Sequence, residues 1–109
     1  VRLCREALEL LNPALTGSRQ ATPLTYLWAG IAFLGTDNTA DAWDYLHTAL
    51  LLETRAFYRG MINLWLGKVA DVRGEHDVAR DFYGRVLALP SADYHQIEAR
   101  NLLKGPFTQ

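Results

Sequence analysis

The segment Leu27-Trp28-Ala29-Gly30 returns as Leu64-Trp65-Leu66-Gly67, a separation of 37 residues. The same spacing relates further identical residues, which are Ala42 and Ala79, Asp44 and Asp81, Leu50 and Leu87, and Leu52 and Leu89. A fixed period of about 20 to 50 residues is typical of repeat proteins, in which each unit buries its apolar face against its neighbours. About two thirds of the chain therefore consists of two copies of one sequence repeat.

Apolar residues recur with helical spacing through the whole chain, and start and stop signals delimit the segments. Thr22 can cap a helix whose first residue is Pro23. Asn12-Pro13 predicts the end of the first helix, because proline disfavours helical geometry in the residue before it. Gly105-Pro106 predicts the end of the last helix, and no segment alternates with the period of two that a strand requires. We therefore expect helices near residues 2–11, 22–34, 39–53, 56–72, 76–89 and 92–104.

A short turn joins the two predicted helices within each repeated unit. The second unit has Gly74 in this turn, and the first unit has Asp37 at the equivalent position. Glycine adopts left-handed backbone geometry without steric cost, and aspartate tolerates it better than most residues. We therefore expect the same turn in both units, with Asn38 or Asp37 capping the helix that follows in the first.

The composition is that of a folded and nearly neutral chain. Half of the 109 residues are hydrophobic, which suffices for a core if neighbouring units stack and which excludes disorder. Eleven basic and twelve acidic residues give a net charge of -1. The overall charge of the protein therefore does not favour binding to nucleic acid or to an anionic membrane surface. No apolar run approaches the roughly 18 residues that span a bilayer. The single cysteine, Cys4, cannot form an internal disulfide. The cysteine content therefore does not distinguish an oxidising from a reducing cellular compartment.

The second unit resembles the tetratricopeptide repeat family, whose units are pairs of antiparallel helices named A and B. Leu66-Gly67 matches the Leu-Gly pair of helix A, and Gly74 matches the glycine between the helices. The small, aromatic and closing positions of helix B are matched by Ala79, Tyr83, Val86, Leu87, Leu89 and Pro90. The first unit matches at fewer positions, and the spacing of 37 departs from the usual 34.

The resemblance implies an all-α fold, a right-handed α-solenoid of about two and a half helix pairs with a C-terminal capping helix. Residues 1–13 would be a helix B without its helix A, residues 22–54 and 56–90 the two repeats, and residues 91–105 the cap. Together they would form one helical domain. Gly67 and Ala79 would allow the helices of the second pair to approach closely.

The two ends of such an array differ. The predicted cap can pack Ala99 inward and keep His95 in water, since the end of a solenoid needs a polar outer face. The N-terminal end shows no such cap, and the sequence begins with Val1 rather than Met. We therefore expect the chain to be part of a longer one.

The helix predicted at residues 22–34 is apolar nearly all round and carries no charge, and such a helix is normally covered on every side. In the resembled family helix A lines a concave groove, which implies partner-binding positions there. On the two helices A these positions are Leu24, Leu27, Ile31, Leu34, Met61, Leu64, Trp65 and Lys68. One interpretation is an apolar groove that receives a partner segment. The other is that upstream helices or the loop at residues 16–20 fill that side.

The residue pattern favours neither a catalytic nor a metal centre. His47, His76 and His95 lie on three different predicted helices, without a second ligand at metal-binding spacing. Acidic residues on the predicted fifth helix are explained as partners of basic ones. Asp77, for example, can pair with Arg80 on a solvated surface.

These observations predict a non-catalytic scaffold that binds a peptide or protein partner and uses no cofactor, metal or nucleic acid. Some members of the resembled family hold a C-terminal carboxylate with Lys and Asn, but Leu27 and Ile31 stand at those positions, so that clamp is not inherited. Two alternatives stay open. The apolar surface can mediate homodimerisation or packing on another domain, or the repeats can regulate an enzyme or a transcription domain of a longer chain.

Overall fold

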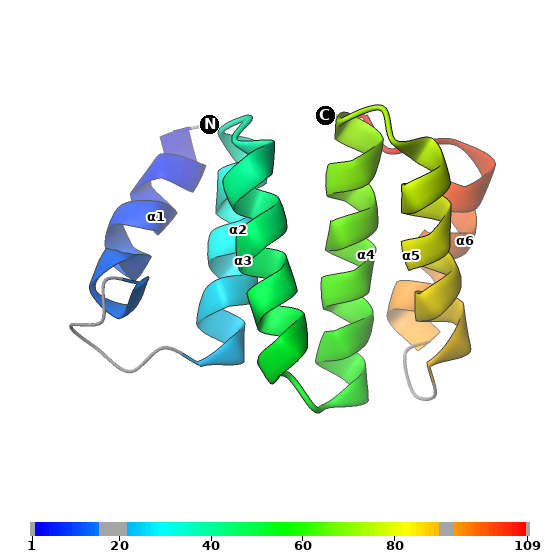
Figure 1. The fold of residues 1–109 in the computed structure, drawn as a ribbon, viewed down its shortest axis with the longest axis horizontal. Coiled ribbons are helices and arrows are strands. Elements are labelled where there is room, and N and C mark those ends of the chain that lie inside the picture. The colour runs from blue at the N-terminus through cyan, green and yellow to red at the C-terminus, as the bar shows by residue number, and fades with distance from the viewer. Residues whose placement is uncertain (1, 16–21, 90–92, 109) are drawn as a thin grey trace. The chain divides into compact units, whose positions relative to one another are not determined.

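The computed structural model describes residues 2–15, 22–89 and 93–108, with side chains described for 4–10, 22–89 and 95–108. These residues form helices and contain no strand, so the predicted all-α class is confirmed for the described part of the chain. The helices are α1 (Arg2–Leu15), α2 (Pro23–Gly35), α3 (Thr39–Leu52), α4 (Ala56–Val72), α5 (His76–Ala88) and α6 (Asp93–Lys104) (Figure 1).

The chain divides into two compact units, Val1–Glu53 and Thr54–Gln109. In the first unit α1 packs against α2, and α2 packs against α3. In the second unit α4 packs against α5, and α6 contacts both of them. Each unit thus holds one of the two related helix pairs.

The helix starts in the first unit use the predicted capping residues. The Thr22 side chain accepts a hydrogen bond from the Thr25 backbone N–H, and the Thr25 hydroxyl accepts one from the Thr22 N–H. This reciprocal pair satisfies donors that the first helical turn leaves free. Asn38, not Asp37, caps α3, because its side-chain oxygen accepts the Asp41 N–H at 3.2 Å.

Two hydrogen bonds recur at equivalent positions in the turns of the two helix pairs. Asp37 and Gly74 both have positive φ, at 62° and 78°. The Asp37 N–H donates to Leu34 and the Gly74 N–H to Asp71, each at 3.0 Å. One residue later, the N–H groups bond to carbonyls five residues back, from Asn38 to Phe33 at 2.9 Å and from Glu75 to Ala70 at 2.8 Å. The expectation that aspartate replaces glycine in the first turn is confirmed.

The first helix is longer than predicted. Its backbone remains helical through Asn12-Pro13 and ends at Leu15, whereas the sequence predicted an end at residue 11. Proline lacks one donor and disfavours helical geometry in the preceding residue, but this is a bias that favourable packing overrides. Pro13 lies in the last turn of α1, where it costs the helix only the hydrogen bond that its missing N–H would donate four residues back.

A glycine in each pair allows the two helices to approach closely. In the first pair a Cβ added to Gly30 would lie 2.5 Å from Leu46 Cγ, and in the second a Cβ added to Gly67 would overlap the Tyr83 ring. Ala79 is fully buried, as the close approach predicted. Stacking of Tyr45 on α3 with α2 adds to the first pair, with a ring-centroid distance of 5.1 Å to Phe33.

The sixth helix is attached to α5 by a polar side chain. Gln96 Nε2 donates toward the carbonyl oxygens of Leu87 and Leu89 at 3.2 and 2.9 Å, where α5 would otherwise leave them unsatisfied. Ala99 is buried, as predicted. The expectation that His95 stays in water is wrong, because its ring is buried and lies 4.7 Å from the Phe57 ring between centroids.

Candidate functional site

The eight residues predicted to contact a partner include buried and half-buried side chains. Leu27 and Leu34 on α2 are 0 % and 1 % exposed, and Leu64 on α4 is 2 % exposed. Lys68 is also buried. The half-buried residues are Leu24, Ile31, Met61 and Trp65.

The fully buried leucines correct the expected groove. A side chain without exposed area offers no contact to a partner, so Leu27, Leu34 and Leu64 belong to the core. For α2 the physical reason is that both α3 and α1 pack against it, and packing by an upstream helix, here α1, was the alternative to an open groove. The surface left for a partner on this helix is smaller than the sequence suggested.

An apolar hollow of about 360 Å³ remains between α1 and α2. The wall consists almost entirely of apolar atoms, and one predicted site residue, Ile31, contributes to it. The lining residues are Cys4, Ala7, Trp28, Ile31 and Ala32. Trp28 is 45 % exposed, so an aromatic side chain of the hollow also reaches solvent.

The size of the side chains on the facing helices explains the hollow. At the end of α2, a Cβ added to Gly35 would overlap Cys4 Sγ, so α1 approaches α2 closely there. One turn earlier along α2, Ala32 faces the hollow together with Ala7 from α1. Two alanines fill little of the space between helices, and the unfilled volume is lined by apolar atoms.

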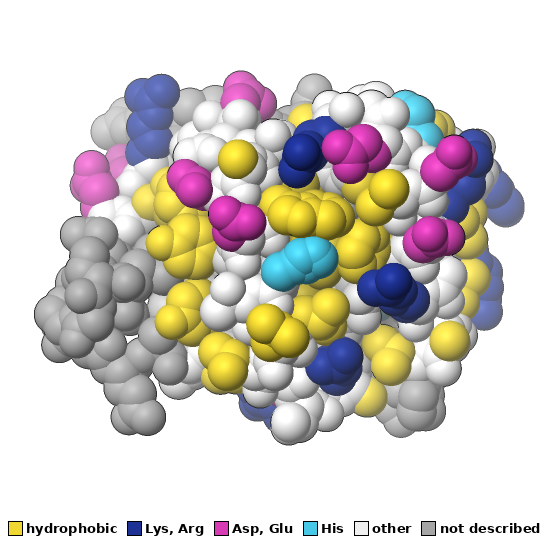
Figure 2. Space-filling model, in the orientation of Figure 1, with side chains coloured by type: hydrophobic (Ala, Val, Ile, Leu, Met, Phe, Trp, Pro, Cys, Tyr) yellow, Lys and Arg dark blue, Asp and Glu magenta, His cyan; other side chains and the backbone are white. Residues whose placement is uncertain are grey.

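Further apolar side chains reach the surface in both units, and Figure 2 shows such side chains interspersed with charged ones on one face. The large hydrophobic residues that are exposed are Leu10, Trp28, Leu51, Leu52, Phe57, Val78, Ile97 and Leu103. Single apolar side chains at the surface are common in soluble proteins. A hollow with an apolar wall is more specific, since an apolar group can be placed against several side chains at once.

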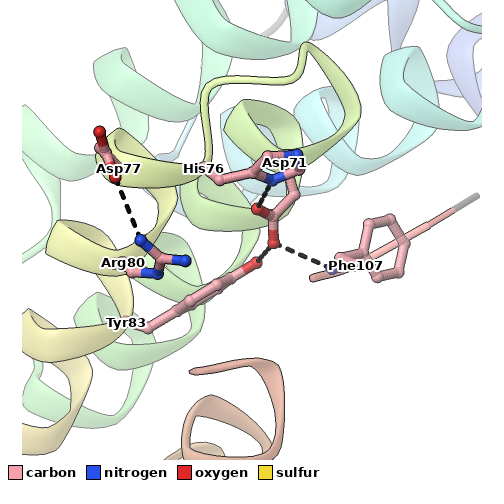
Figure 3. A network of polar contacts seen from close by, with 6 residues as sticks. All are labelled: Asp71, His76, Asp77, Arg80, Tyr83 and Phe107. Atoms are coloured by element: carbon pink, nitrogen blue, oxygen red, sulfur yellow. Dashed lines mark hydrogen bonds and ion pairs between the residues drawn. The ribbon is translucent and has the colours of Figure 1, made fainter. Parts of the chain in front are cut away.

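The second unit contains a network of polar contacts centred on the Asp71 carboxylate of α4 (Figure 3). Tyr83 OH donates to Asp71 Oδ2 at 2.6 Å, and the Phe107 backbone N–H donates to the same oxygen at 2.9 Å. His76 Nδ1 lies 2.8 Å from Oδ1. The Asp71 side chain is only 2 % exposed, so these donors replace the water that the carboxylate loses on burial.

The Tyr83 hydroxyl is a donor throughout the physiological pH range. Burial raises the pKa of Tyr83, and its hydrogen bond to Asp71 and the negative charges of Asp71 and Glu98 raise this pKa further. The phenol therefore keeps its proton. This network fixes the end of α4, the start of α5 and the segment after α6 at one carboxylate.

Lys68 lies one helical turn before Asp71 and is surrounded by an acid and two aromatic rings. Its Nζ is 2.6 Å from Glu98 Oε1 of α6. The same atom lies 4.0 Å from the centroid of Trp65 and 5.2 Å from that of Phe107. An ammonium group within about 6 Å of a ring is attracted to its face. The predicted site residue Lys68 is thus engaged by α6 and by the segment that follows it.

No sequence pattern marks Phe107 as a site residue, because its contacts depend on the path of the chain after α6. The segment after Lys104 returns to α4, where Phe107 meets Asp71 and Lys68. Asp71 and Phe107 are 36 residues apart, and neither belongs to a periodic pattern that relates them. The Gly105-Pro106 pair predicted only that the helix ends.

Burial of His95 leads to a prediction on pH. Burial lowers the pKa of His95 more than any other effect; Glu98 opposes this change and Lys68 adds to it. Below about pH 6.5, the ordinary histidine value, the unfolded chain takes up the proton first. The free energy of unfolding should therefore fall as the pH drops below 6.5, by at most about 1.4 kcal/mol per pH unit from this residue.

Urea denaturation at a series of pH values measures this effect. In the variant His95→Leu the decline below pH 6.5 should be shallower than in the parent, because the titrating group is absent. Parallel pH profiles for the two chains would show that His95 does not titrate differently in the folded and unfolded states.

Within the described residues, no group of three His, Cys, Asp or Glu side chains is arranged to hold a metal ion. The Asp71 carboxylate orients the His76 ring, but no described Ser, Thr or Cys side chain is hydrogen-bonded to that ring. The predicted surface pair of Asp77 and Arg80 is confirmed at 3.1 Å. In the same described part, no helix is both long and apolar enough to cross a membrane.

Comparison of the chain with protein-family models, curated proteins and solved structures gives no significant match.

Proposed function

We propose that the chain is a non-catalytic interaction module whose helix pairs are tetratricopeptide-like repeats of a right-handed solenoid and which binds a peptide or protein partner. The matching hydrogen bonds of the Asp37 and Gly74 turns support the repeat assignment, since they recur with the period of the sequence. So do the close contacts at Gly30 and Gly67, which are also 37 residues apart.

The observation that carries the binding proposal is the apolar hollow between α1 and α2. Binding sites in proteins enclose roughly 300 to 1,000 Å³ and are lined mostly by apolar side chains, and the hollow lies within that range. An apolar cavity wall offers little to water but gains from burying a leucine or phenylalanine side chain. We expect the partner to place one such side chain here, beside Trp28 and Ile31.

A selection from displayed random peptides tests the proposal. Peptides that bind the parent chain should be enriched in leucine, phenylalanine or other large apolar residues. The variant Ala7→Phe fills the hollow from α1 and should weaken binding of the selected peptides at least tenfold. The matched control Ala40→Phe makes the same change at an exposed position on α3 and should leave binding unchanged.

Two outcomes would contradict the proposal. One is a selection that yields no binding peptide, and the other is equal binding of the selected peptides to the parent and to Ala7→Phe. Sedimentation of the parent without peptide distinguishes the alternative use of this surface. A dimer that is lost in Ala7→Phe and kept in Ala40→Phe would assign the hollow to homodimerisation.

A further inference from the structure

The segment Gly105–Thr108 contacts α4 through Phe107. The Phe107 N–H donates to Asp71, and the Phe107 ring lies near Lys68. Its neighbours Gly105, Pro106 and Thr108 are exposed. The segment is thus held on α4 by one backbone hydrogen bond and one ring contact, with the residues on both sides in solvent. Opening of this segment breaks that hydrogen bond and that ring contact but no hydrogen bond within a helix.

Asp71 provides a subsite for a peptide backbone. Of the two donors to Oδ2, the Tyr83 hydroxyl comes from the packed helix pair and the Phe107 N–H comes from the external segment. A backbone N–H is present in every residue except proline, so the carboxylate recognises an extended chain without regard to its side chain. When Phe107 leaves, the buried oxygen loses a charge-assisted hydrogen bond that another peptide N–H can restore.

Lys68 and Trp65 provide a subsite for the side chain. The Lys68 ammonium group lies over the Trp65 ring and forms an ion pair with Glu98. The Phe107 ring is a second aromatic contact of the same group. A cation attracts the face of an aromatic ring more strongly than it attracts an aliphatic side chain. The subsite therefore favours an aromatic residue at the same position that supplies the backbone N–H.

We propose that α4 carries a second peptide site, that Gly105–Thr108 is its internal ligand, and that a partner peptide with an aromatic residue in place of Phe107 displaces it. The proposal rests on the proposed function in taking the chain to be a peptide-binding module. It uses other residues and another chemistry than the hollow, which belongs to α1 and α2. The internal segment lowers the apparent affinity for the partner, because it must leave before the partner binds.

The test uses the full chain with the substitution Phe107→Ala and a peptide probe of the sequence Lys-Gly-Pro-Phe-Thr-Gln, a copy of residues 104–109 with both ends blocked. Binding is followed by nuclear magnetic resonance at the indole N–H of Trp65, up to millimolar peptide. The variant should bind the peptide at least tenfold more tightly than the parent. A probe with alanine in place of phenylalanine should bind neither chain. The control Thr108→Ala changes an exposed neighbour and should behave as the parent.

Each other result overturns the proposal. Equal binding to the parent and to Phe107→Ala would show that the segment does not compete for the site, and no binding to either would show that there is no site. Loss of helicity in Phe107→Ala would make the segment part of the core. The double variant Ala7→Phe with Phe107→Ala should bind the probe as the single variant does. A failure of the hollow and a failure of the α4 site are therefore distinguishable.

Discussion

Substituting Leu27→Asp should cost about 4 kcal/mol or more of unfolding free energy, enough to unfold α1–α3 in a marginally stable chain. Leu27 has no exposed area, so the new carboxylate would lose its water without gaining a partner of opposite charge. Far-ultraviolet circular dichroism with urea denaturation measures the loss.

The control for this substitution is Ile31→Lys on the same helix. Ile31 is half-buried beside the hollow, and the long stem of lysine can carry its ammonium group to solvent. We expect a change within about 1 kcal/mol, as for most substitutions at partly exposed positions. If Leu27→Asp keeps the parent's helicity and denaturation midpoint, Leu27 is accessible to solvent and the interpretation of α2 as one wall of an open groove is correct.

Asp71→Ala should lower the free energy of unfolding by about 2 to 4 kcal/mol. The substitution leaves the buried Tyr83 hydroxyl without its acceptor and removes the carboxylate that Phe107 and His76 contact. Removing a charged acceptor from buried donors costs more than the net value of the hydrogen bonds, because the donors stay desolvated. Thermal or urea denaturation of the variant and the parent provides the comparison.

Asp77→Ala is the matched control, because it removes a carboxylate that is paired with Arg80 but fully solvated. Exposed ion pairs contribute little, and we expect a change within about 0.5 kcal/mol. Equal destabilisation by Asp71→Ala and Asp77→Ala would mean that the Asp71 network does not stabilise the second unit.

Interactions between residues close in sequence were sufficient to predict the presence of the helices and the turns between them. The Thr22 cap and the choice of aspartate or glycine at the turns depend on neighbours within a few residues. Each is determined by backbone sterics or by a hydrogen bond that closes over a short loop. The end of α1 was missed because packing overrides the local preference of Asn12-Pro13.

The candidate site was less predictable, because it depends on contacts between distant residues. Periodicity identified α2 as apolar all round, but it could not show that α1 and α3 enclose Leu27 while leaving the hollow at Ile31. The polar residue His95 was expected in water, yet its position on α6 places it against Phe57. The seating of Phe107 on Asp71 depends on the path of the chain after α6.

The two helix pairs differ in the residues that face Gly30 and Gly67. This difference limits which side chains can be exchanged between the two pairs. The positions that hold Tyr83 and Asp71 in the second copy hold Leu46 and Leu34 in the first. Transfer of aspartate alone into the first copy would bury a carboxylate opposite a leucine, which has no donor. Placing leucine alone at the Asp71 position of the second pair would leave the Tyr83 hydroxyl without an acceptor. An exchange of side chains between the two helix pairs should therefore be tolerated at these two positions only when both residues of a pair are exchanged together, because Tyr83 and Asp71 are joined by a hydrogen bond.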